Sequence, residues 1–264
     1  MAKLTYRFFS TSLMRSITFD MLIPGDLPET RAKAGGFAGI KQVLFLLHGY
    51  TGSADIWVSE QLAEKYGVTV VMPNGENGFW LDGMSTGHKY ATLLGEELPD
   101  LISAVFGVKL DASNTSVLGL SMGGFGALHT ALAYPERFGR AGVMSPALIV
   151  HEVANMEPGS GNGVANYEYY RECFGEPSEL LGSKNDPEAL ADGILADKRK
   201  MPSLYICCGT EDFLLPNTAQ MHDFLVSRGI EHEFKTSKGG HEMGFWMEYT
   251  EKIMEWMYGE NAEK

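Results

Sequence analysis

The sequence contains few cysteines, no long apolar run and no cluster of basic residues. Only three cysteines (Cys173, Cys207 and Cys208) occur among 264 residues. They lack the spacing of a zinc site, so we expect buried structural thiols in a reducing compartment. A formal net charge of −13 without a lysine/arginine run disfavours nucleic acid and anionic membranes as partners. No apolar stretch approaches the ~20 residues of a membrane-spanning helix, and residues 1–7 lack a signal-peptide pattern. These absences predict a cytoplasmic protein that needs neither a metal nor a cofactor.

The remaining composition is that of an ordinary globular domain, with 44% hydrophobic and 21% charged residues. Apolar segments alternate along the chain with segments of helical period. The expected strands are 17–23, 42–47, 68–72, 115–118, 140–144, 204–208 and 230–236, the expected helices are 57–66, 92–106, 122–134, 216–228 and 244–258, and a loop is expected at 27–40. Apolar strands that alternate with helices are typical of a mostly parallel sheet covered on both faces. We therefore predict a single α/β domain over residues 1–264.

Residues 147–201 interrupt this alternation. They contain a glycine-rich stretch and three tyrosines, Tyr167, Tyr169 and Tyr170. An insertion of this length between two strands starts near the carboxyl edge of the sheet, where α/β proteins bind their ligands. We predict that residues 147–201 form a cap or lid over the functional site.

The pentapeptide G-x-S-x-G occurs twice, and its glycines allow a sharp strand-to-helix turn around a nucleophilic serine. The copies lie at residues 83–87 and 119–123, with Ser85 and Ser121 at their centres. Only the second copy follows a predicted strand and precedes a run of helical period, which ends at Pro135. We therefore predict a nucleophile elbow at Ser121 and interpret the first copy as a chance match in a glycine-rich loop.

A serine hydroxyl needs an adjacent base before it can attack an ester at neutral pH. His241 follows two glycines, between the last predicted strand and the last predicted helix, so it can reach the carboxyl edge of the sheet. The other histidines beyond the elbow helix lie in the predicted cap, in a helix and in a strand: His151, His222 and His232. We predict His241 as the base.

The acid that orients this histidine must lie at the same edge of the sheet. Asp212 directly follows the predicted strand 204–208 and is the best candidate, with its neighbour Glu211 as the alternative. Two further acids fit less well because they belong to the predicted cap: Asp192 and Asp197.

The oxyanion formed during attack needs backbone N–H donors. Met122, next after the serine, is the first predicted donor, and Tyr50, in the loop after strand 42–47, is the second. His48 ends that strand and is interpreted as a structural residue. The candidate substrate-binding side chains are Trp80, Tyr167 and Trp246. A remaining role for the Ser85 loop, beside Trp80, is to line the acyl pocket without taking part in chemistry.

Taken together, these motifs resemble the esterase D family of α/β-hydrolases. That family includes S-formylglutathione hydrolases, bacterial tributyrin esterases, cinnamoyl or feruloyl esterases and mycolyltransferases. The similarity spans nearly the whole chain and rests on Leu47-His48-Gly49-Tyr50, Met72-Pro73-Asn74-Gly75, Phe79-Trp80, Glu97-Leu98-Pro99, the segment 119–128, Gly209-Thr210-Glu211-Asp212-Phe213 and Gly240-His241.

The resemblance implies an α/β-hydrolase fold with Ser121, Asp212 and His241 as a catalytic triad. It also implies the Tyr50 and Met122 amides as oxyanion donors. Two elbow positions that are usually histidine in S-formylglutathione hydrolases are Leu120 and Phe125 here. The elbow is therefore more similar to that of tributyrin esterases.

A serine carboxylesterase that cleaves small acyl esters is the leading functional hypothesis, with acetyl, butyryl or cinnamoyl groups on carbohydrate as candidate substrates. A feruloyl esterase and an S-formylglutathione thioesterase are the alternatives within the family. A non-catalytic binding protein on a hydrolase scaffold is the alternative from another class. The expected partner is a small-molecule ester, and a homo-oligomer stays open.

Overall fold

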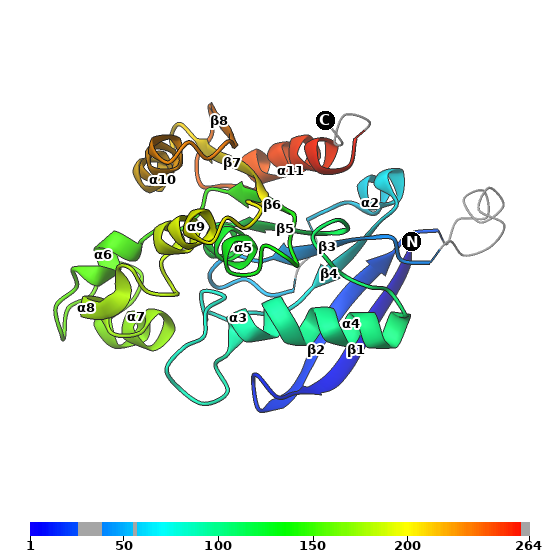
Figure 1. The fold of residues 1–264 in the computed structure, drawn as a ribbon, viewed down its shortest axis with the longest axis horizontal. Helices are drawn as coiled ribbons and strands as arrows, with labels where there is room; N and C mark the ends of the chain where they lie inside the picture. The colour runs from blue at the N-terminus through cyan, green and yellow to red at the C-terminus, as the bar shows by residue number, and fades with distance from the viewer. Residues whose placement is uncertain (26–38, 55–56, 260–264) are drawn as a thin grey trace.

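A computed structural model describes residues 1–25, 39–54 and 57–259 of the chain. Within them, the strands form one sheet in the order β1-β2-β4-β3-β5-β6-β7-β8 (Figure 1). The strands are β1 (Ala2–Ser10), β2 (Arg15–Ile23), β3 (Gln42–Leu47), β4 (Val68–Met72), β5 (Thr115–Leu120), β6 (Arg140–Met144), β7 (Ser203–Gly209) and β8 (Glu233–Ser237). From β4 to β8 all neighbours are parallel, whereas β1 and β2 form an antiparallel hairpin at one edge. The prediction of a mostly parallel sheet is confirmed.

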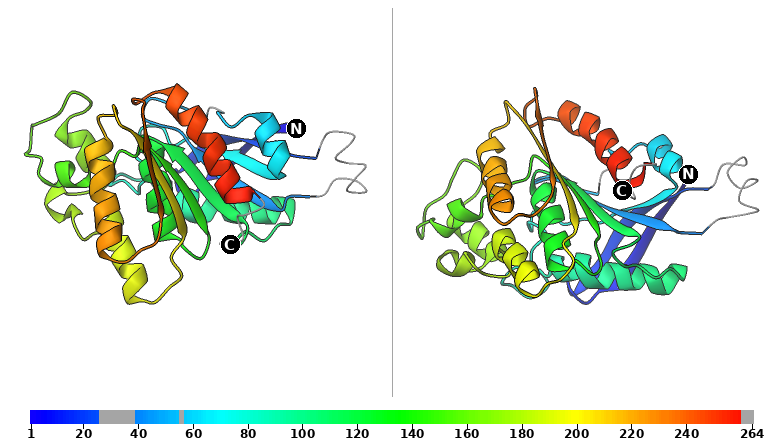
Figure 2. Two further views of the ribbon diagram at one scale, coloured as in Figure 1. Left: turned by 90° about the horizontal axis from the view of Figure 1, so that it is seen from above. Right: turned by 45° about the horizontal axis from the view of Figure 1, so that its top comes forward.

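The helices cover both faces of the sheet, as the two turned views show (Figure 2). They are α2 (Glu60–Tyr66), α3 (Tyr90–Thr92), the π-helix η1 (Leu93–Glu97), α4 (Leu98–Phe106), α5 (Met122–Ala133), α6 (Val150–Ala154), α7 (Tyr167–Phe174), α8 (Pro177–Leu180), α9 (Pro187–Ala196), α10 (Leu215–Ser227) and α11 (Met243–Tyr258). Helices α2 and α11 pack on one face, and α4, α5, α9 and α10 pack on the other.

The central strands show why the sequence folds this way. Successive side chains of β3 point to opposite faces, so Phe45 joins the core beneath α5 while Leu44 joins the core beneath α11. Helices cover both faces of the sheet, so neither side of a central strand contacts water. A strand that is apolar at every position is therefore favoured. Helix α5 is buried along nearly its whole length, which explains its apolar composition on all sides.

The structure corrects several element boundaries. The strand β1 was missed, and the helix expected at 57–66 begins only at Glu60, where Ser59 caps it by accepting a hydrogen bond from the Leu62 N–H at 3.1 Å. The expected helix at 92–106 is interrupted by the π-helix η1. There the Tyr134 ring packs so closely on Gly95 that a Cβ would lie 2.1 Å from it. Most of the expected loop at 27–40 lies outside the described residues.

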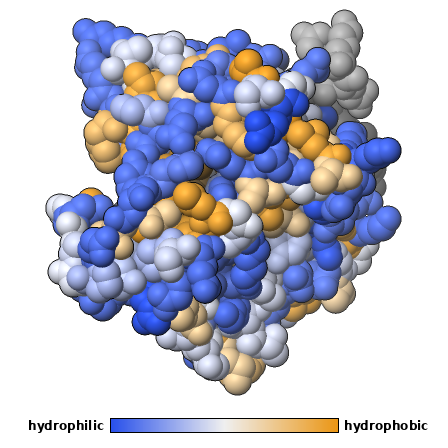
Figure 3. Space-filling model, turned by 60° about the vertical axis from the view of Figure 1, so that its left-hand side comes forward, coloured by the Kyte–Doolittle hydropathy of each residue, from blue (hydrophilic) through white to orange (hydrophobic). Residues whose placement is uncertain are grey.

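Residues 147–201 lie between β6 and β7 and contain the short helices α6, α7 and α8 followed by α9. Helices α6 to α8 gather at one end of the molecule, on the left of Figure 1, whereas α9 packs against α5. The insertion is therefore attached to the sheet through a helix of its own. No helix in the described part of the chain is long and apolar enough to cross a bilayer. The face drawn in Figure 3 is mainly polar, with apolar side chains in separate patches.

Candidate active site

Ser121 lies in a strained turn between β5 and α5. Its backbone has φ 56° and ψ −120°, a region that side chains other than glycine avoid at a cost of about 1–3 kcal/mol. The flanking glycines make this turn possible, because a Cβ on Gly119 would lie 1.9 Å from the Gly123 oxygen. A Cβ on Gly123 would lie 2.0 Å from the Leu47 oxygen. The second pentapeptide thus forms the sharp strand-to-helix turn expected of an elbow.

A chain of hydrogen bonds connects Ser121 to His241 and Asp212. The His241 Nε2 lies 2.9 Å from the Ser121 Oγ, and its Nδ1 lies 2.9 Å and 3.1 Å from the two Asp212 carboxylate oxygens. A carboxylate only accepts, so Nδ1 carries the proton and the lone pair of Nε2 faces the serine hydroxyl. This tautomer is the one in which the imidazole can take a proton from Ser121.

The Asp212 carboxylate is fully buried and firmly bound. In addition to His241, the Leu214 N–H donates to Oδ1 at 2.9 Å. Burial acts to raise the pKa of Asp212, but the hydrogen bonds from His241 and the Leu214 amide outweigh it, and the pKa lies below its ordinary value. The carboxylate therefore remains ionised at neutral pH, opposite the ring that would become an imidazolium.

Two aromatic rings hold the His241 imidazole from different sides. The Phe213 and Trp246 ring centroids each lie 4.8 Å from the centroid of the His241 ring, and the Trp246 ring is perpendicular to it. The Trp246 Nε1–H donates to the buried Ser145 Oγ at 3.1 Å. Trp246 is fixed by its backbone in helix α11 and by the hydrogen bond of its ring to Ser145. It therefore limits the rotation of the His241 ring.

The loop after β3 lies against the elbow. A Cβ on Gly49 would lie 3.0 Å from the Leu120 side chain and 3.3 Å from the Ser121 Cβ, so a larger residue there would make these neighbours shift. Thr51 has φ 62°, and its N–H donates to the Asn77 Oδ1 at 2.8 Å. Tyr50 lines the same cavity as Ser121, while Met122 begins α5, where the first N–H groups have no partner within the helix.

His48 also has a structural part in this loop. Its Nε2 lies 3.0 Å from the donating Gly75 N–H and its Nδ1 lies 2.8 Å from the Gly49 oxygen. Since Nε2 accepts, Nδ1 is the protonated nitrogen and donates to Gly49. His48 therefore connects the loop after β3 to the loop after β4, in agreement with its structural interpretation.

A cavity of about 340 Å³ opens at Ser121. Its walls consist of His48, Gly49, Tyr50, Thr51, Gly52, Trp57, Leu120, Ser121, His241, Met243 and Trp246. Of the three aromatic residues predicted to bind substrate, only Trp246 lines it. The walls include no side chain from 147–201, so the predicted cap flanks the site and does not cover it in this conformation.

The prediction for Trp80 was wrong. Its side chain is fully buried, its Nε1–H donates to the His48 oxygen at 3.2 Å, and its ring occupies the space that a Cβ on Gly126 would need. Tyr167 lies half-buried at the start of α7, away from the cavity walls. Both residues are held by core or helix packing, which a local sequence pattern does not reveal.

The insertion contacts the site through Tyr169. Its ring lies 5.8 Å from that of Tyr50 in a T-shaped arrangement, and its hydroxyl donates to the Asn77 oxygen at 2.5 Å. Asn77 therefore connects two residues: its backbone oxygen accepts from Tyr169, and its side chain accepts from the Thr51 N–H. The sequence reasoning noted the tyrosine cluster but could not choose Tyr169 from it, and Asn77 carried no signal beyond its position in a turn-rich segment.

The first G-x-S-x-G copy attaches the insertion to the body of the protein. The Ser85 hydroxyl and N–H donate to the two Glu172 carboxylate oxygens at 2.8 Å and 2.9 Å, and the His88 Nδ1 lies 3.0 Å from the same carboxylate. The Ser85 hydroxyl thus donates to a carboxylate, and the nearby His88 contacts that carboxylate as well. Its loop is absent from the cavity walls, so the suggestion that it lines the acyl pocket is not supported.

We expect the Glu172 contacts to make the stability of the insertion depend on pH. Burial acts to raise the pKa of Glu172, but bonds from Ser85 and His88 outweigh it, so the pKa is lowered. A lowered folded-state pKa stabilises the fold above the unfolded value of about 4.3 and loses this effect as the pH falls. Glu172→Gln should therefore lower the free energy of unfolding at pH 7 by about 1–2 kcal/mol, with a smaller difference below about pH 4.

Thermal unfolding between pH 7 and pH 3 measures this effect. Glu168→Gln is the matched control, because Glu168 is exposed on the same helix α7, and it should change stability little at any pH. An equal loss for Glu172→Gln at every pH would show that the carboxylate charge has no part in the attachment.

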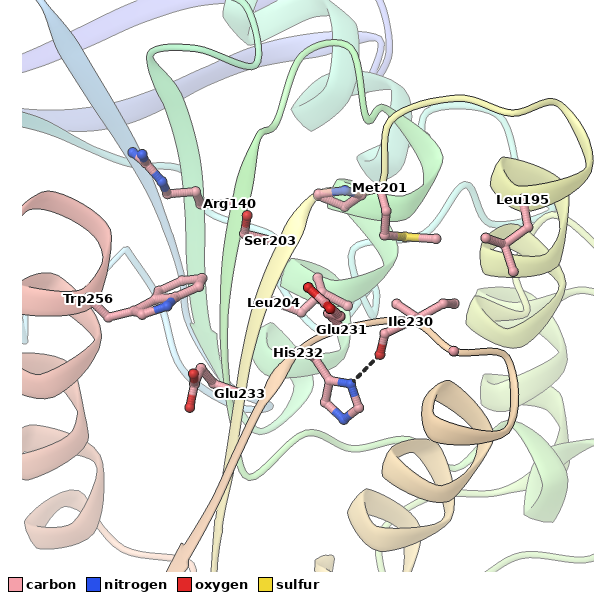
Figure 4. A pocket seen from close by; sticks show the side chains of 12 residues that line it. Arg140, Leu195, Met201, Ser203, Leu204, Ile230, Glu231, His232, Glu233 and Trp256 are labelled. Atoms are coloured by element: carbon pink, nitrogen blue, oxygen red, sulfur yellow. Dashed lines mark hydrogen bonds between the residues drawn. The ribbon is translucent and has the colours of Figure 1, made fainter. Parts of the chain in front are cut away.

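A larger cavity lies at the amino ends of the parallel strands, on the side of the sheet away from Ser121 (Figure 4). It measures about 580 Å³ and includes Arg140 and Ser203, which begin β6 and β7. Ser121, by contrast, follows the carboxyl end of β5. The histidines that were set aside as bases have other partners: His151 contacts Glu188, and His222 and His232 contact each other.

Comparison with known proteins identifies relatives along the whole chain. Residues 10–252 match the model of the family described as "Putative esterase". An acetyl esterase from Caldicellulosiruptor saccharolyticus is 33% identical over 261 residues, covering 97% of this chain and 98% of the relative. The solved structure of the fluorophosphonate-binding serine hydrolase FphF from Staphylococcus aureus matches with a TM-score of 0.82 and 22% identity, covering 97% and 98% of the two chains. The S-formylglutathione hydrolase FrmB from the same species matches with a TM-score of 0.80 and 23% identity at the same coverage. The fold is that of the α/β-hydrolases.

Proposed function

The chain belongs to the esterase family matched by residues 10–252, and we propose that it is a serine carboxylesterase that hydrolyses esters of small acyl groups, of acetyl or butyryl type, through an acyl-enzyme. The observation that carries this proposal is the hydrogen-bonded series of Ser121, His241 and Asp212, of which Ser121 and His241 line an open cavity. Its order along the chain, serine then acid then histidine, is that of the α/β-hydrolases.

In the first half of the proposed reaction, the Ser121 Oγ attacks the ester carbonyl carbon and His241 Nε2 takes the hydroxyl proton. The carbonyl oxygen becomes an oxyanion, which the N–H groups of Tyr50 and Met122 stabilise. When the carbon–oxygen bond to the alcohol breaks, His241 returns the proton to the leaving oxygen. The alcohol departs, and the acyl group stays on Ser121.

In the second half, a water molecule attacks the acyl-enzyme and gives a proton to His241. Collapse of this intermediate releases the carboxylic acid, and the proton returns from His241 to Ser121. Asp212 remains ionised throughout and stabilises the imidazolium. Each half therefore needs one base, one oxyanion site and one fixed carboxylate, and the hydrogen bonds of His241 with Ser121 and Asp212 support the first and the last of these roles.

The preference for a small acyl group is supported by the 33% identical relative, which is an acetyl esterase. A panel of methyl esters with acyl groups from acetyl to dodecanoyl tests it, together with methyl ferulate and S-formylglutathione. We expect kcat/KM to be highest between acetyl and butyryl. A clear preference for ferulate or for the thioester would replace the proposed substrate class with the corresponding alternative.

A further inference from the structure

A second cavity adjoins the one at Ser121. It measures about 560 Å³ and shares two wall residues, Trp57 and Met243, with the catalytic cavity. Its walls are Lys3, Asp20, Leu22, Ala54, Trp57, Val58, Ser59, Glu60, Met72, Met243 and Met247. The two cavities therefore adjoin at Trp57 and Met243, and the second extends along the first turns of α11 toward β2 and β4. We call this second cavity the distal groove.

The position of His241 decides which half of an ester would enter the distal groove. His241 gives its proton to the leaving oxygen, so the alcohol must depart beside its Nε2. Met243 stands two residues after His241 at the start of α11, and Met247 follows one turn later on the same side of the helix. A path from the cavity at Ser121 into the distal groove therefore passes Met243 and then Met247.

The walls of the distal groove are suited to an apolar group. Leu22, Val58 and Met72 form a buried floor, whereas Met243 and Met247 are 47% and 55% exposed to solvent. When a ligand removes large exposed apolar side chains around a cavity from water, the free energy of the complex falls. Methionine side chains also adapt to ligands of different shape.

The charged groups at the far end need no ligand. The Lys3 Nζ lies 3.2 Å from the Asp20 carboxylate, and the Thr5 hydroxyl donates to the same carboxylate at 2.6 Å. Glu60 is exposed to solvent. An apolar ligand that ends short of these groups leaves their bonds and their hydration intact.

We propose that the distal groove binds the alcohol half of the ester and selects alcohols with an alkyl or aryl group. This inference rests on the proposed function. It adds that the alcohol half of the ester, and not only the carbonyl that reacts, determines which substrates are selected. Met247 lines only the second cavity, so a substitution at Met247 tests the distal groove without changing a wall of the cavity at Ser121.

Two series of esters test the proposal with purified enzyme. In acetates of methanol, butanol and hexanol, kcat/KM should rise about two- to fourfold per methylene, since each buried methylene contributes about 0.8 kcal/mol. Met247→Glu should flatten this series, and Met247→Leu, which conserves volume, should retain it. Methyl acetate, methyl butyrate and methyl hexanoate vary the acyl group instead, and their relative rates should be the same in the wild type and both variants.

Met14→Glu is the control for adding a carboxylate to an exposed methionine, because Met14 is 59% exposed in the β1–β2 turn. It should leave the alcohol series unchanged. A flat alcohol series in an active wild-type enzyme would overturn the distal groove alone. So would an effect of Met247→Glu confined to the acyl series, or a preference for acetylated glucose over hexyl acetate. Failure to hydrolyse any ester, with no labelling of Ser121 by a fluorophosphonate, would overturn the proposed function as well.

Discussion

Replacing Ser121 with alanine is expected to lower kcat/KM for an acetate ester by about 10⁴-fold or more. The substitution removes the attacking oxygen, and without it the acyl-enzyme cannot form. Ser85 cannot take over, because its hydroxyl donates to Glu172 and the nearby His88 contacts the same carboxylate. The initial rates of 4-nitrophenyl acetate hydrolysis by wild type and variant measure the loss.

The matched control for this experiment is Ser85→Ala, which changes the centre of the other G-x-S-x-G copy. It should retain activity within about threefold, since Ser85 lies outside the cavity at Ser121. A fluorophosphonate should label wild type and Ser85→Ala, but not Ser121→Ala. An active, unlabelled Ser121→Ala enzyme would remove Ser121 from its proposed role, and an inactive, unlabelled wild type would favour the non-catalytic alternative.

The second large effect is expected for Asp212→Asn, with a loss of about 10³- to 10⁴-fold in kcat. Asparagine keeps the size of the side chain but replaces the buried charge with a neutral amide. The amide NH₂ would then favour the His241 tautomer with its proton on Nε2, which cannot accept the Ser121 proton. The imidazolium would also lose its counter-charge in a buried site. Steady-state kinetics with an acetate ester measure the change.

Glu211→Gln provides the comparison, because Glu211 is the neighbouring acid that the sequence left open. Glu211 is exposed, whereas Asp212 is buried and lies 2.9 Å from His241. We expect Glu211→Gln to keep most of the activity and to unfold near the wild-type temperature. A larger loss for Glu211→Gln than for Asp212→Asn would reverse the assignment.

The aromatic residues show where reasoning from sequence failed. Trp80, Tyr167 and Trp246 were the candidate substrate-binding side chains, yet of these three only Trp246 lines the cavity at Ser121. The Trp80 ring fills the space beside Gly126 in the core, and the contact to Tyr50 comes from Tyr169. A pattern of residue types identifies aromatic side chains, but their direction depends on packing between segments that are far apart in the sequence.

By itself, the sequence determined the parallel α/β architecture and the grouping of Ser121, Asp212 and His241. The physical reason is that each of the three follows a strand of the parallel part of the sheet, and parallel strands bring their carboxyl ends to one edge of a sheet. Only the tertiary structure decided that the Ser85 copy holds Glu172 of the insertion and that the insertion flanks the cavity. It also decided that two cavities adjoin at Trp57 and Met243. These features depend on contacts between distant segments, for which no local periodicity exists.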